Sequence, residues 1–142
     1  MLKNSIFAGL AASIFGTIIS VAYINVFKYS PLEADFSEKA SISYLLQMNM
    51  AIGMVNCIVY FGLAKLFKKE NIAAFINGFL LSGVAISLAL LLMFTVDTKL
   101  TFKNENADLY KDFYFFIIAP IPFFSVLSWF TFKPLFIKET TK

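Results

Sequence analysis

The sequence contains no histidine, no arginine and a single cysteine, Cys57. Without histidine the chain cannot build imidazole metal sites, histidine-ligated haem or histidine acid–base catalysis. One cysteine can form neither an internal disulfide nor a thiolate cluster. We interpret Cys57 as a small packing residue, because free cysteines in apolar surroundings are usually buried and inert. These absences predict a protein that is not an enzyme and that has no cofactor and no metal site.

Charge is also scarce. Only 15% of the 142 residues are charged, whereas 59% are hydrophobic and 18% are aromatic. Soluble domains are usually about 45–50% apolar, so this chain has too little polar surface to cover itself in water. We therefore expect a lipid bilayer around it. The net charge of +3 is too small, and too widely spread among the loops, to indicate nucleic-acid binding.

Four apolar windows are long enough to cross a bilayer, which takes about 20 residues each. They cover residues 5–27, 42–67, 73–96 and 113–132. The connection between the second and third windows is short, which favours antiparallel neighbouring helices. We predict an all-α integral membrane protein in which residues 1–142 form one domain, an antiparallel bundle of four transmembrane helices.

The lysines predict the orientation of the bundle, since cytoplasmic loops carry an excess of positive residues. The side with both termini would carry seven lysines and two acids, and the opposite side five lysines and seven acids. This bias predicts that both termini lie in the cytoplasm (N-in/C-in) and that the protein is a multi-pass protein of a cell inner membrane. The abundance of Phe, Ile, Asn and Lys is typical of a low-GC bacterium.

The first window also resembles a cleavable signal peptide. Lys3 precedes an apolar run, and Ser20-Val-Ala22 has the small-x-small pattern of a cleavage site. The apolar run continues to Phe27, however, which is long for a signal segment. We expect a retained transmembrane helix.

The second window carries an interior polar stripe. Residues spaced by four, three and four positions share one face of a helix, and this spacing joins Asn49, Gly53, Asn56 and Tyr60. An unsatisfied amide costs several kcal/mol in hydrocarbon, so we expect both asparagines to point into the bundle. Two interpretations stay open: the stripe fixes helix packing, or it lines a small polar cavity that binds a ligand.

Small residues form similar stripes in the first and third windows, where helices in lipid approach each other closely. The predicted helix-packing residues are Gly9, Ser13, Gly16, Ser20, Gly78 and Ser82, the last two in a third-window stripe with Ala74, Ala85 and Ala89. The fourth window differs, because Pro120 and Pro122 remove backbone donors and predict a helix kink. A kink of this kind fits a helix around its neighbours, although broken helices also mark transporter sites. We interpret Trp129 as an anchor at the membrane interface.

Two functions remain after these exclusions. The first is a small non-catalytic subunit or interaction protein of a larger bacterial membrane complex, which fits the small size and the near absence of soluble domains. The alternative is a small-molecule or ion transporter or channel that acts as a homo-oligomer, because four short helices are too few to enclose a wide path. Besides the bilayer, we expect a membrane-protein partner or further copies of the chain.

Overall fold

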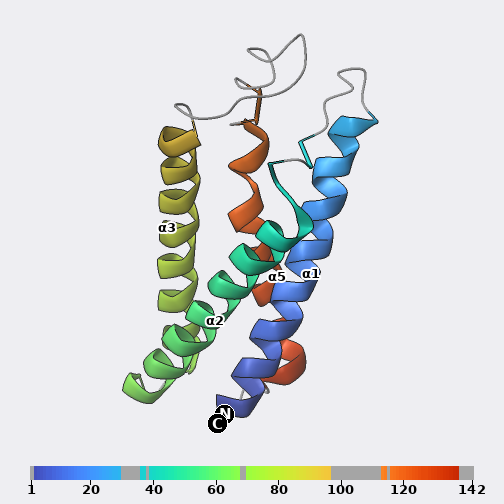
Figure 1. The fold of residues 1–142 in the computed structure, drawn as a ribbon. Coiled ribbons are helices and arrows are strands. Elements are labelled where there is room, and N and C mark those ends of the chain that lie inside the picture. Colours follow the sequence, from blue (N-terminus) through green and yellow to red (C-terminus); the bar gives the residue numbers. More distant parts are fainter. Residues whose placement is uncertain are drawn as a thin grey trace.

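The structure is a computed structural model that describes residues 2–29, 36–37, 39–67, 70–96, 113–114 and 116–137. The described residues form an all-helical bundle (Figure 1). Its elements are α1 (Leu2–Lys28), α2 (Ile42–Leu66), α3 (Glu70–Val96) and α5 (Ile121–Phe136). Within the described residues, four helices are long and apolar enough to cross a membrane, the fourth span being Phe116–Phe136. The predicted four-helix membrane bundle is therefore confirmed.

Consecutive helices run in opposite directions, so α1 begins at the same end of the bundle at which α5 ends (Figure 1). We call this end, which carries Leu2 and Phe136, the terminal end. Helix α1 packs against both α2 and α5, and α3 packs against α2 and α5 from another side. Which side of a membrane the terminal end faces stays a prediction from the lysines.

The fourth span is interrupted near its start and extends further than predicted. Residues 116–118 are helical, a turn follows at 119–120, and Pro120 and Pro122 stand at the first turn of α5. Proline fits a first helical turn because the backbone N–H groups there have no intrahelical partner. The predicted end at residue 132 is too early, since α5 continues through Lys133 and Pro134 to Phe136.

Helices α1 and α2 cross in close contact at Gly9 and Gly53. A Cβ atom added to Gly9 would lie 2.9 Å from the backbone oxygen of Gly53 and would collide with the Cys57 sulfur. A Cβ atom added to Gly53 would lie 2.8 Å from the backbone oxygen of Gly9 and would collide with the Ser13 hydroxyl. Each glycine therefore leaves room for the backbone of the other helix.

A second close contact joins α1 to α5. A Cβ atom added to Gly16 would lie 3.1 Å from the Cα of Ser125 and 3.2 Å from the Oδ1 of Asn49. The Ser13 and Ser20 hydroxyls on the same face of α1 donate to the carbonyl oxygens of Gly9 and Gly16, at 2.7 and 2.6 Å. These bonds satisfy the hydroxyl protons inside the helix, so α1 presents a smooth, narrow face to both neighbours.

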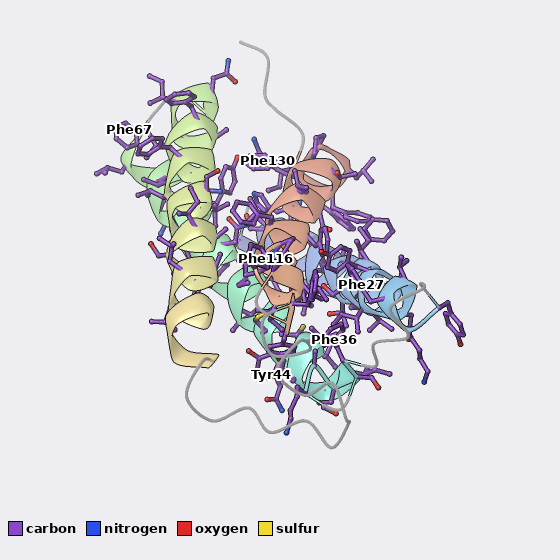
Figure 2. All side chains as sticks on the ribbon, turned by 90° about the horizontal axis from the view of Figure 1, so that it is seen from above. Phe27, Phe36, Tyr44, Phe67, Phe116 and Phe130 are labelled. Carbon is purple, nitrogen blue, oxygen red and sulfur yellow. The ribbon has the colours of Figure 1, made fainter. Side chains whose placement is uncertain are left out.

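The buried face of α3 follows the predicted stripe of small residues only in part. Ala73, Asn77, Leu81, Ala85 and Ala89 are buried. Ala85 and Ala89 belong to the predicted stripe, whereas Ser82, predicted on the same face, is exposed. Gly78 and Ser82 each lie one position, about 100° of helix rotation, beyond the buried Asn77 and Leu81. Gly78 lies at the edge of the contact, against the Phe130 ring that lies between α5 and α3 (Figure 2).

Alanine at either crossing glycine should destabilise the bundle, by about 1–3 kcal/mol as in other overpacked cores. The control positions are Gly62 and Gly83, where an added Cβ meets no atom within 4 Å. Alanine there should be neutral, or stabilising by about 0.4–1 kcal/mol, because it favours the helix. The measurement is reversible unfolding in mixed detergent micelles. Equal losses of stability at Gly9 and Gly62 would contradict the proposed close contact.

Candidate functional site

All four residues of the predicted polar stripe on α2 lie inside the bundle. Asn49, Asn56 and Tyr60 have no exposed surface, and Gly53 forms the crossing with α1. The stripe runs along α2 from the level of Ser125 on α5 towards the terminal end. The neighbours of the stripe show that the half around Asn49 and the half nearer the terminal end differ in chemistry.

Asn49 joins three helices. Its Nδ2 donates to the backbone oxygen of Leu45 at 2.8 Å and to the Ser20 hydroxyl of α1 at 3.4 Å. Its Oδ1 accepts a hydrogen bond from the Ser125 hydroxyl of α5. Both ends of this amide are therefore satisfied by protein groups, which is what a buried amide in an apolar bundle requires. Asn49 acts as a connector of α1, α2 and α5.

Asn56 has a partner that the sequence reading missed. The Nδ2 of Asn77, on α3, donates to the Oδ1 of Asn56 at 3.0 Å, and both residues are at most 1% exposed. Asn77 could have been found from its spacing, since Ala73, Asn77 and Leu81 recur every four residues on one helix face. This pair is the polar connection between α2 and α3.

The terminal end of the stripe is aromatic and carries one cation. The ring of Tyr60 meets that of Trp129 edge-on, with centroids 5.9 Å apart. The Nζ of Lys133 lies 5.0 Å from the centroid of the Tyr60 ring, a cation–π geometry. Trp129 is 0% and Lys133 7% exposed within the chain, so the interpretation of Trp129 as an interface anchor is wrong. Its ring instead fills the space between α5 and α2.

Buried polar atoms without a hydrogen-bond partner occur on three helices in the described part of the chain. They include the Nδ2 of Asn56, the Oδ1 of Asn77 and the Nε1 of Trp129. Exchanging the O and N positions of both amides moves the free donor to Asn77 and the free acceptor to Asn56, so the pair still keeps one of each. The hydrogen-bonding groups in the half of the stripe nearer the terminal end are thus only partly satisfied, unlike those around Asn49.

The remaining predicted chemistry is limited. Cys57 is buried, and its thiol donates to the backbone oxygen of Ser5 on α1 at 2.9 Å. Among the described residues no group of three His, Cys, Asp or Glu side chains could hold a metal ion. No family model, no curated protein and no solved structure matches this chain. The features of this chain that bear on its function are therefore the polar stripe and the outer surface of the bundle.

Leucine at either Asn56 or Asn77 alone should destabilise the bundle by about 1–2 kcal/mol, because the other amide loses its bond in a buried setting. Leucine at both positions should restore most of that stability, since no polar group is then left without a partner. The measurement is a double-mutant cycle of unfolding free energies in micelles.

Asn49 provides the matched control for this cycle. Its hydrogen bonds are made with Leu45, Ser20 and Ser125 rather than with Asn77. The effects of Asn49→Leu and Asn77→Leu should therefore add within about 0.5 kcal/mol. Additive effects for Asn56 and Asn77 as well would show that their contact contributes nothing specific.

Proposed function

We propose that this four-span membrane protein is a non-catalytic subunit or interaction protein of a larger bacterial membrane complex. The absence of histidine and the small size of the chain support a non-catalytic role. The described surface supports a partner at one particular place, the outer face of α3. This helix is the least buried of the four spans, with 22% of its apolar window buried inside the bundle.

The observation that carries the proposal is a pair of small residues in the middle of that exposed face, Ser82 and Gly83, which we call the small-residue step. Ser82 and Gly83 are both exposed, and a Cβ atom added to Gly83 meets no atom within 4 Å. Phe79 nearby is 76% exposed, so the step adjoins a bulky apolar side chain. Membrane helices associate where small residues let their backbones approach, and lipid alone gives no reason for a step of this kind. The step fits an apolar helix of a partner protein.

A specific observation also favours the alternative, a small-molecule or ion transporter or channel formed by several copies. Asn56, Asn77 and Trp129 keep buried polar atoms without partners in the described part of the chain. The turn at residues 119–120 also interrupts the fourth span, as in helices that bind transported solutes. The two functions differ in whether the chain works alone.

The test is purification of the tagged full-length chain from native membranes in mild detergent, followed by mass spectrometry. We expect stoichiometric recovery of another membrane protein with the wild type. Gly83→Leu should reduce that recovery severalfold, because a bulky side chain there holds a partner helix away. Gly62→Leu is the matched control, since Gly62 is also an exposed helical glycine with no atom within 4 Å of its Cβ position.

Two outcomes would argue against the proposal. Equal partner recovery with Gly83→Leu and Gly62→Leu would show that the outer face of α3 does not bind the partner. A clean homo-oligomer would support the transporter. Flux into vesicles that the wild type shows and Asn56→Leu loses would then identify Asn56 as part of the transport path.

A further inference from the structure

Three of the buried polar atoms without a hydrogen-bond partner come from three different helices. Asn56 lies on α2, Asn77 on α3 and Trp129 on α5, and none of these residues is more than 1% exposed. Each unsatisfied group of this kind costs several kcal/mol in hydrocarbon. Buried polar atoms in proteins nearly always have a partner, either a protein group or a bound molecule.

The contacts between the helices bring these residues to one region. The amides of Asn56 and Asn77 are joined by a 3.0 Å hydrogen bond between α2 and α3. Trp129 packs on Tyr60, which lies one helical turn from Asn56 on α2. The next residue, Phe130, places its ring against Gly78, so α5 also packs against α3 here. The region is therefore bounded by α2, α3 and α5.

The charges around the region decide which class of molecule fits. Lys133 lies one turn beyond Trp129 on α5, with its Nζ over the Tyr60 ring, and its positive charge disfavours a cation. An anion would accept from Asn56 and Trp129 but would face the Oδ1 of Asn77, which can only accept. A neutral molecule that both donates and accepts hydrogen bonds matches a region with two free donors and one free acceptor.

We propose that α2, α3 and α5 form a binding site for a small neutral hydrogen-bonding molecule. The molecule accepts hydrogen bonds from Asn56 and Trp129 and donates to Asn77, at the level of the bundle between Asn56 and the terminal end. Water is the smallest member of this class, and a small amide solute is a larger one. This site consists of other residues than the partner surface on α3 proposed above.

The single tryptophan of the chain makes the site measurable. All tryptophan fluorescence comes from Trp129, whose indole N–H is one of the three site atoms. The experiment uses the full-length chain in phospholipid vesicles, with D₂O, acrylamide, iodide and caesium as probes. We expect D₂O to raise the emission, because water reaches and exchanges the indole proton. Acrylamide, a neutral amide, should quench Trp129 more strongly than iodide or caesium does.

The probes separate the possible occupants. A D₂O effect without acrylamide quenching supports the site with water as its occupant, and both effects together support a site that also admits a small amide. No D₂O effect would overturn the proposal, because the indole N–H would then be shielded from water. Stronger quenching by iodide or by caesium would also overturn it, since the site would then favour an ion.

Variants tie the signal to the site. The double variant Asn56→Leu/Asn77→Leu removes two of the three polar atoms and should reduce the D₂O effect and the acrylamide quenching severalfold. Ser128→Ala is the control, because Ser128 is buried beside Trp129 but its hydroxyl donates to the backbone oxygen of Phe124, at 2.6 Å. It should keep the wild-type signal. If the double variant does not fold, the wild-type probe series alone decides the matter.

Discussion

The close approach of α1 and α2 at Gly9 and Gly53 is the constraint on which the rest of the bundle depends. At each glycine the Cβ position is occupied by groups of the other helix, including a backbone oxygen within 3 Å. A backbone oxygen cannot rotate away as a flexible side chain can, so the crossing point has almost no freedom. Since Asn49 lies one turn before Gly53 and Asn56 one turn after it, the crossing also sets the direction of both amides.

The two amides share one face of α2 but meet different surroundings. Asn49 points to the side where α1 and α5 supply the hydroxyls of Ser20 and Ser125, and its bonds are complete. Asn56 points to α3, where Asn77 supplies one hydrogen bond. One donor and one acceptor of this amide pair keep no hydrogen-bond partner. We therefore assign the structural interpretation of the stripe to Asn49, which connects helices, and propose the ligand-binding interpretation for Asn56.

The sequence predicted the parts that each helix determines by itself. The length of a span and the spacing of Gly9, Ser13, Gly16 and Ser20 follow from bilayer thickness and helical period, so both were found. On α3 the predicted face was right at Ala85 and Ala89 but wrong at Ser82, because small residues occur on two sides of this helix. Only the contact between Asn77 and Asn56 chooses the inward side. The burial of Trp129 and Lys133 was missed for the same reason, since it depends on Tyr60 of another helix.

Helix α3 connects the two proposals made for this protein. The other three helices are joined by glycine contacts and by the complete bonds of Asn49, whereas the polar contact of α3 is a half-satisfied amide pair beside the apolar packing of Leu81 and Ala85. Its outer face carries the Ser82–Gly83 step. A partner that shifts α3 by binding this step also shifts Asn77 against Asn56. Because coupling between two binding sites is reciprocal, a molecule held by that amide pair would in turn change the affinity for the partner.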